Sequence, residues 1–291
     1  MIVVDFLAQN STAFYLFIVL LGLIVGSFLN VVIHRLPKMM EQQWHRDCDE
    51  LKGLASEDAI ETEVYNLNTP ASHCPKCQHK IRPWENIPVI SWLLLKGRCS
   101  NCQNPISVRY PIIEAVTGLL SLWIAFHFGF SWEANAALLL TWSLIALTVI
   151  DFDVQLLPDN ITLPFLWLGL LVNINGLFTD LESAVIGAIA GYMALWSVVQ
   201  LFKKLTGKEG MGYGDFKLLA MLGAWLGWQY LPQIILLSAL VGAVVGILLI
   251  VVRGRDRNIP IPFGPYLAAA GWISLMWGSQ INQAYLRWSG L

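Results

Sequence analysis

Charged residues are scarce in this chain. Asp, Glu, Lys and Arg make up 13% of the 291 residues, whereas 56% of the residues are hydrophobic. Soluble globular proteins carry about twice that share of charge, so the composition excludes an ordinary soluble domain. The net charge of −2 includes no basic excess of the kind that favours nucleic acid, and no nucleic acid partner is expected.

The N-terminus lacks the positive charge that a secretory signal peptide needs. Asp5 is the only charged residue before Arg35, and no small-residue cleavage site closes the apolar run that follows. We therefore expect Thr12–Ile33 to be a retained first membrane span.

Long apolar runs are abundant and determine the fold class. Most approach the roughly 20 residues that cross a bilayer as a helix, while the fourth and sixth are shorter and need help from flanking residues. In chain order they are Thr12–Ile33, Ile112–Phe128, Ala134–Ile150, Ile161–Ile174, Ala184–Phe202, Phe216–Trp228, Ile234–Val252 and Ile261–Met276. The sequence predicts an all-α polytopic membrane protein with about eight transmembrane helices.

Lysine and arginine are missing from alternate loops. Of the 18 such residues, 17 fall in four segments, namely Arg35–Arg109, Lys203–Lys208, Lys217 and Arg253–Arg257. The loops Phe128–Ala134, Asn173–Ser183 and Gly227–Gln233 carry none. By the positive-inside rule the four basic segments face the cytoplasm, and both termini lie outside.

One polar segment interrupts the apolar runs. We divide the chain into a first span (1–36), a cytoplasmic insert (37–110) and a seven-span membrane bundle (111–291). Within the insert, the acidic stretch Glu41–Glu63 has apolar residues at helical spacing and is predicted to form an exposed helix.

The second half of the insert contains two CxxC pairs. Cys74 and Cys77 are separated from Cys99 and Cys102 by 21 intervening residues, close to the spacing of a structural zinc site with four thiolates. Two disulfides or a redox CxxC are the alternatives, but a reducing cytoplasmic loop favours metal. His73 and His79 flank the first pair and are possible substitute ligands, and Cys48 has no partner. The metal would supply folding energy to an insert with little core of its own.

Three acids follow the third apolar run. Asp151 comes directly after it, and Asp153 and Asp159 lie in the following turn. Asp159 has a structural explanation, because an acid at the start of the fourth helix balances the helix dipole. Asp153 is explained as a solvated residue. Asp151 lies at the edge of lipid, where an ionisable group is costly and indicates function.

A second acid ends a glycine-rich loop. Gly210, Gly212 and Gly214 precede Asp215, and they give a backbone that can approach a ligand closely or take positive φ. A phosphate-binding loop is excluded because neither a preceding strand nor a following Lys-Ser/Thr is present. Asp151 and Asp215 thus share the cytoplasmic face, on spans three and six, as the two catalytic carboxylates of an aspartic protease would.

Small residues recur at four-residue spacing in the later spans. They are Gly187, Gly191, Gly223, Gly227, Gly242 and Gly246. Such patterns let membrane helices approach closely, so we expect these glycines to serve helix packing.

Taken in order, these motifs resemble the type IV prepilin leader peptidase family, whose members are aspartic proteases with a Gly-x-Gly-Asp loop. The resemblance rests on the segment from Gly26 to Pro37, the double CxxC, the segment Asp151–Asp159 and the Gly-x-Gly-Asp loop, and it covers nearly the whole chain. It implies that Asp151 and Asp215 cleave the leaders of type IV prepilins or type II secretion pseudopilins at the cytoplasmic face of the bacterial inner membrane.

The same resemblance implies that the new N-terminus is methylated with S-adenosylmethionine. The sequence offers no soluble-type glycine-rich motif for this cofactor, so its site is not located. Asn30, His34 and Arg35 cluster at the end of the first span and are candidates to line it, although helix termination and interfacial anchoring explain them equally well. Glu114 is a further intramembrane acid that could contact either site.

Two other functions compete with this interpretation. A transporter or proton channel would also use intramembrane acids, but it predicts them near the bilayer midplane, where this sequence is apolar. A zinc-bearing assembly scaffold without activity would leave both aspartates unexplained.

Overall fold

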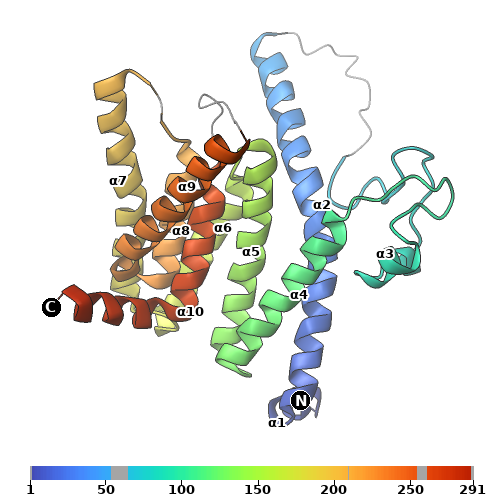
Figure 1. Ribbon diagram of the computed structural model, residues 1–291, viewed down its shortest axis with the longest axis horizontal. Helices are drawn as coiled ribbons and strands as arrows, with labels where there is room; N and C mark the ends of the chain where they lie inside the picture. Colours follow the sequence, from blue (N-terminus) through green and yellow to red (C-terminus); the bar gives the residue numbers. More distant parts are fainter. Residues whose placement is uncertain (1, 54–64, 209, 254–260, 290–291) are drawn as a thin grey trace. The chain divides into compact units, whose positions relative to one another are not determined.

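The computed structural model describes residues 2–53, 65–208, 210–253 and 261–289. The helices are α1 (Ile2–Gln9), α2 (Ser11–Leu51), α3 (Ile90–Leu94), α4 (Arg109–Phe128), α5 (Trp132–Val154), α6 (Asp159–Val172), α7 (Leu181–Thr206), α8 (Tyr213–Leu226), α9 (Leu231–Arg253) and α10 (Gly264–Ser289), with short 3-10 turns η1 (Pro83–Asn86), η2 (Asn173–Asn175) and η3 (Trp228–Tyr230). The described ranges contain two isolated bridges but no strand, which confirms the all-α prediction for this part of the chain. The chain forms two compact units, Met1–Phe130 and Ser131–Leu291 (Figure 1).

In the first unit, α2 and α4 pack together through small residues. A Cβ added to Gly22 would lie 2.7 Å from Ser121 Oγ, and one added to Gly26 would lie 2.7 Å from Glu114 Cα. Real Cβ atoms do not approach so closely, so glycine is needed for the two helices to pack at this distance. Asn30, one turn further along α2, donates to the backbone oxygen of Tyr110 at 3.2 Å and fixes the start of α4.

The helix α2 extends well beyond the predicted first span. It includes Thr12–Ile33 and continues through Pro37 to Leu51. At 1.5 Å per residue its 41 residues are about 60 Å long, roughly twice the thickness of a bilayer core. Residues 41–51, the start of the predicted exposed helix Glu41–Glu63, are helical and exposed, and residues 54–63 of that stretch lie outside the described residues.

In the second unit, α8 lies at the centre and contacts α6, α7 and α10. Every residue from Asp215 to Leu226 except Lys217 is buried. A helix that is apolar on all sides needs partners on all sides, which explains why this short element forms the core. Asp215 is therefore carried by the most enclosed helix of the unit.

Close packing of α7 on α8 depends on the predicted glycine pattern. A Cβ on Gly223 would lie 2.1 Å from the Gly187 carbonyl oxygen, and a Cβ on Gly191 would lie 2.7 Å from the Leu219 carbonyl oxygen. These contacts are to backbone, which cannot rotate away. The predicted role in helix packing is confirmed for these three glycines.

The ends of α6 and α8 are joined by one buried amide. Asn173 donates to the carbonyl oxygens of Ala224 and Trp225, both at 2.9 Å, and its Oδ1 accepts from the backbone N–H groups of Phe178 and Thr179. The side chain therefore makes four hydrogen bonds, as a buried amide requires.

Each of the eight predicted apolar stretches contributes to a helix, but their lengths differ. Among the described residues, five helices are long and apolar enough to cross a bilayer: α2, α4, α5, α7 and the stretch Trp228–Val252 that contains α9. With 14 residues each, α6 and α8 are about 21 Å long and do not reach across alone. The predicted shortness of the fourth and sixth stretches is thus confirmed, while the exact number of spans stays a prediction.

The helix α10 bends where the predicted last span ends. That stretch finishes at Met276, and Trp277 has non-helical angles of φ −130° and ψ 16°. Figure 1 shows the final turns of α10, in dark red, running across the direction of α5 rather than along it.

Candidate active site and metal centre

Asp151 lies in the last turn of α5 and is 5% exposed. The helix ends at Val154 and is capped by Gln155 in a left-handed conformation, and the acid is the last buried polar group before the turn. The backbone N–H of Gly264, the first residue of α10, donates to Asp151 Oδ2 at 3.0 Å. One carboxylate oxygen is therefore held by the start of another helix.

Asp215 lies in the first turn of α8, within electrostatic reach of Asp151. The side chain is 8% exposed, and its Oδ1 is buried without a hydrogen-bond partner in the part of the chain that the structure describes. Buried polar atoms are rarely left unpaired, and this oxygen is free to accept a hydrogen bond from a molecule that enters the site. The structure thus brings together the two aspartates that the sequence singled out.

Leu157 packs near two glycines beside this pair, Gly214 and Gly264. A Cβ on Gly214 would lie 2.8 Å from Leu157 Cβ, and a Cβ on Gly264 would lie 2.6 Å from Asp151 Oδ2 and 3.2 Å from Leu157 Cδ1. Gly210, Gly212 and Gly214 do not have positive φ. At Gly214 glycine is thus required for close approach, and positive φ, the other expected reason, does not apply.

The other two acids of the turn lie outside the buried pair. Asp159 begins α6, and both of its carboxylate oxygens accept from Lys217 Nζ of α8 at 2.7 Å. This ion pair joins the two helices near Asp215 and gives Asp159 a structural role other than the predicted balance of the helix dipole. Asp153 is exposed.

Sequence reasoning did not identify Gly264. It lies in Pro262-Phe263-Gly264-Pro265, where two prolines flank a glycine at a helix start. That pattern signals an unusual backbone but does not indicate that the glycine N–H meets a carboxylate 113 residues away.

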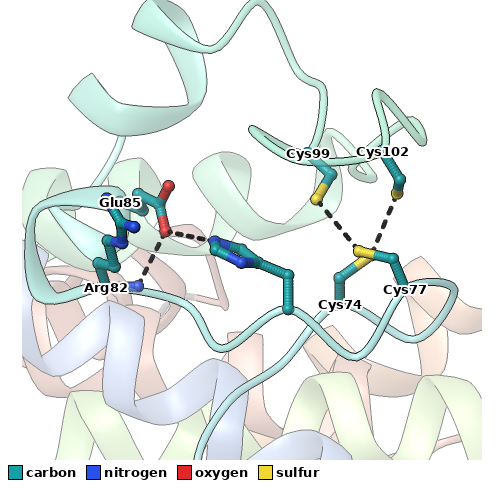
Figure 2. Close-up of polar contacts among 7 residues, drawn as sticks. Cys74, Cys77, Arg82, Glu85, Cys99 and Cys102 are labelled. Carbon is teal, nitrogen blue, oxygen red and sulfur yellow. Dashed lines mark hydrogen bonds and ion pairs between the residues drawn. The ribbon is translucent and has the colours of Figure 1, made fainter.

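In the first unit, the four cysteines of the two CxxC pairs form one cluster. Their sulfur atoms all lie within 4.8 Å of one another. Cys74 and Cys102 are 3.7 Å apart, and Cys77 and Cys99 are 3.9 Å apart. Figure 2 shows one pair on each of two facing loops. All four are free thiols, so this arrangement could hold a metal ion.

The two loops repeat the same backbone hydrogen bonds. Gln78 and Gln103, each following a CxxC, have φ 56° and donate to the carbonyl oxygens of Cys74 and Cys99. The backbone N–H of Cys74 in turn donates to the His79 carbonyl, and that of Cys99 donates to Asn104. Each CxxC is therefore a tight turn that directs two sulfur atoms to one side.

The thiols differ in acidity. The backbone N–H of His79 favours the Cys77 thiolate and lowers the pKa of Cys77 to about 6. At Cys102 the Asn104 backbone N–H acts in the same direction, but desolvation and the three neighbouring thiols outweigh it and raise the pKa to about 11. Negative charge on all four sulfur atoms thus requires a cation among them.

Glu85 links the two cysteine loops. Its Oε2 accepts from the Arg82 backbone N–H at 2.9 Å and lies 3.5 Å from His79 Nε2 (Figure 2), and its carboxylate also interacts with Ser100. The Arg82 N–H is the main cause that lowers the pKa of Glu85. His79 belongs to this contact, while the Nδ1 of His73 lies 2.9 Å from the Ala71 carbonyl oxygen. Neither histidine is part of the metal-capable group, and Cys48 is exposed on α2.

Two buried charged residues hold the loops of the insert. Arg35 donates to the carbonyl oxygens of Asn66, Leu67 and Pro70 at 2.6–3.3 Å. Glu114 accepts from the Val89 backbone N–H at 2.7 Å. These contacts account for both side chains structurally. His34 Nε2 lies 3.2 Å from Lys38 Nζ, one turn further along α2.

Comparison with known proteins covers most of the chain. Residues 20–128 match the bacterial peptidase A24 N-terminal domain, and residues 138–247 match the type IV leader peptidase family. No solved structure matches.

Several relatives match nearly end to end. A Pseudomonas aeruginosa protein named prepilin leader peptidase/N-methyltransferase is 59% identical over 98% of both chains. Proteins of the same name from Stutzerimonas stutzeri and Aeromonas hydrophila are 59% and 56% identical, over 99% and 94% of both chains. The chain belongs to the type IV leader peptidase family.

Proposed function

We propose that this protein is a bifunctional enzyme that removes the leader peptide of type IV prepilins or type II secretion pseudopilins and then methylates the new N-terminus. The proposal is supported by the full-length likeness to relatives named prepilin leader peptidase/N-methyltransferase. The single structural observation that carries it is the buried pair Asp151 and Asp215, with one unpartnered carboxylate oxygen.

Two carboxyl groups in one buried site favour sharing a single proton, because like charges at short range repel. In the proposed reaction, water binds between them. The ionised carboxylate takes a proton from the water as its oxygen attacks the peptide carbonyl carbon, and the protonated carboxyl gives its proton to the carbonyl oxygen. The resulting diol then collapses, the C–N bond breaks, and the amine leaves with a proton returned by the pair.

Gly264 has a positioning role in this mechanism. Its N–H holds Asp151 Oδ2, so the second oxygen of Asp151 and Oδ1 of Asp215 are left for water and substrate. A helical substrate must also unwind locally, because its peptide bonds are shielded by their own hydrogen bonds.

The metal in the proposed function is a structural zinc ion held by Cys74, Cys77, Cys99 and Cys102. A tetrahedral site with Zn–S bonds of about 2.3 Å requires sulfur separations of about 3.8 Å. The distances of 3.7 Å and 3.9 Å fit that requirement. When bound, zinc neutralises the thiolates and fastens the two cysteine loops together.

The proposed topology has eight spans with both termini outside and both sites on the cytoplasmic side of the bacterial inner membrane. The charge distribution of the loops supports it. S-adenosylmethionine would supply the methyl group. We assign no described residue to its binding, because Asn30, Arg35 and Glu114 are engaged in holding backbone.

The test is leader removal by purified protein in detergent. Wild type should shorten a prepilin, and mass spectrometry should find the new N-terminus methylated when S-adenosylmethionine is present. Asp151→Asn and Asp215→Asn, which keep side-chain size, should each abolish cleavage. Asp153→Asn is the matched control and should cleave normally. Cleavage by either of the first two variants would refute the catalytic assignment.

A further inference from the structure

The segment between the two cysteine loops carries an exposed apolar surface. It comprises residues 83–95, includes η1 and α3, and is called the α3 segment below. Ile90, Leu93 and Leu94 are 55%, 61% and 78% exposed, and Trp84 and Ile87 are also exposed. Soluble surfaces rarely present so many large apolar side chains together.

A buried acid determines where this segment lies along α4. Glu114 Oε2 accepts from the Val89 backbone N–H at 2.7 Å. Glu114 is five residues into α4, about 7.5 Å from its first residue, and α4 is itself about 30 Å long, the thickness of a bilayer core. Val89 is therefore tied to a point inside the membrane-spanning length of α4 rather than beyond its end.

The backbone turns sharply at Val89. Val89 has φ 61° and ψ −50°, and the Ile90 N–H donates to the Pro88 carbonyl oxygen at 2.6 Å. This is a tight γ-turn that a β-branched residue rarely adopts, and it persists where surrounding contacts hold it. Glu114 provides such a contact.

A second attachment holds the other end of the segment. Trp92 Nε1 donates to the Ile106 carbonyl oxygen at 3.1 Å, and the Ile106 N–H donates to the Gly97 carbonyl oxygen at 2.7 Å. The segment is thus attached near Val89 and again at Trp92.

We propose that the α3 segment lies in the bilayer, in the leaflet that α4 enters at Arg109, with its apolar side chains among the acyl chains. Lipid is the occupant because the attachment to Glu114 places the segment within the length of α4 that lipid surrounds. Exposed Lys96 and Arg98 directly follow and suit anionic headgroups, and Trp84 is of the type that anchors at the interface. The metal-capable cluster, which brackets the segment, is thereby held at the membrane surface.

The test measures depth and does not depend on catalysis. A trifluoromethyl-phenylalanine replaces Leu94 in the full-length protein, which is placed in nanodiscs of phosphatidylethanolamine and phosphatidylglycerol. Fluorine NMR then compares relaxation by a lipid with a nitroxide on its acyl chain and by a water-soluble nickel chelate. We expect the lipid nitroxide to broaden the signal severalfold more than the chelate does.

Two further sites calibrate the measurement. The same label at Ile24, exposed within the apolar part of α2, reports lipid, and the label at Leu51, at the far end of α2, reports water. A Leu94 signal that follows Leu51 would overturn the proposal. Shielding from both reagents would indicate a second copy of the chain and would overturn it equally.

Variants of Glu114 test the attachment. Glu114→Gln retains an oxygen that can accept from Val89, so the label at residue 94 should remain at lipid depth. Glu114→Ala removes the acceptor, and the label should become several times more accessible to the nickel chelate. Equal accessibility in both variants, with zinc content unchanged, would refute the role of Glu114 in setting the depth.

Discussion

Replacing Gly264 by alanine should separate catalysis from stability. The added Cβ would lie 2.6 Å from Asp151 Oδ2 and 3.1 Å from its Cγ. Ordinary contact begins at 3.4 Å, so the carboxylate must retreat by about 0.8 Å. The hydrogen bond from the Gly264 N–H, now 3.0 Å, cannot keep its geometry through that shift.

A displacement of this size is large for a catalytic group. A misplacement of about 1 Å costs up to about a hundredfold in rate, or about 2.7 kcal/mol of activation free energy. The free energy of unfolding should change less. Alanine restricts the unfolded chain, which stabilises the folded protein by up to about 1 kcal/mol and offsets part of the strain. We expect kcat for leader cleavage to fall about a hundredfold, with the melting temperature nearly unchanged.

The assay is steady-state cleavage of a prepilin in detergent, with thermal unfolding followed in parallel. Gly212→Ala is the matched control. Gly212 has φ −76° and open space around its Cβ position, so this variant should keep wild-type kcat. A folded Gly264→Ala protein with wild-type kcat would refute the role of Gly264 and weaken the assignment of Asp151.

Three further outcomes are expected. Cys74→Ser should contain less zinc, measured by elemental analysis, and its insert should be more sensitive to protease. Cys48→Ser is the control and should change neither property. Full zinc content in Cys74→Ser would contradict the four-cysteine site. Gly223→Val should lower the free energy of unfolding by about 1–3 kcal/mol, because its Cβ meets the backbone of α7. An unchanged midpoint of denaturant unfolding would show that α7 and α8 can move apart at no cost in stability. Lys217→Asp should lower the free energy of unfolding by at most about 1 kcal/mol, since the ion pair with Asp159 is partly exposed. Adding Asp159→Lys to the same chain reverses the pair and should restore the lost stability. Failure of that rescue would show that the ion pair does not stabilise the protein.

The sequence predicted those parts of the site that depend on local pattern. Cys74 and Cys77 lie in one turn, so their spacing alone restricts where their sulfur atoms point, and the second pair repeats it. Asp151 and Asp215 each follow or begin an apolar helix, which predicted their position at helix ends. Their proximity required only that these two helix ends lie on the same face of the membrane.

Features that depend on long-range packing were not predictable in this way. The meeting of Gly264 with Asp151 requires the start of α10 to pack against the end of α5, and local pattern does not encode that. The attachment of Val89 to Glu114 was missed because the insert was interpreted as polar throughout, although Ile90, Leu93 and Leu94 interrupt that character. The shortness of α6 and α8 follows from Pro158 and Gly227 at their boundaries, and it leaves the span count to be measured.

The two ends of α8 differ in their capping hydrogen bonds, and this difference predicts where the helix opens first. At the end near Trp225, the side chain of Asn173 donates to two carbonyl oxygens of α8, those of Ala224 and Trp225. At the other end, Gly212 offers no side-chain cap, and Asp215 begins the buried stretch only two residues into the helix. Local opening should therefore start at the first turn of α8, so amide exchange should be fastest there and slowest towards Leu226. Water and substrate can then be admitted to Asp215 by fraying one turn, while the rest of the helix remains packed.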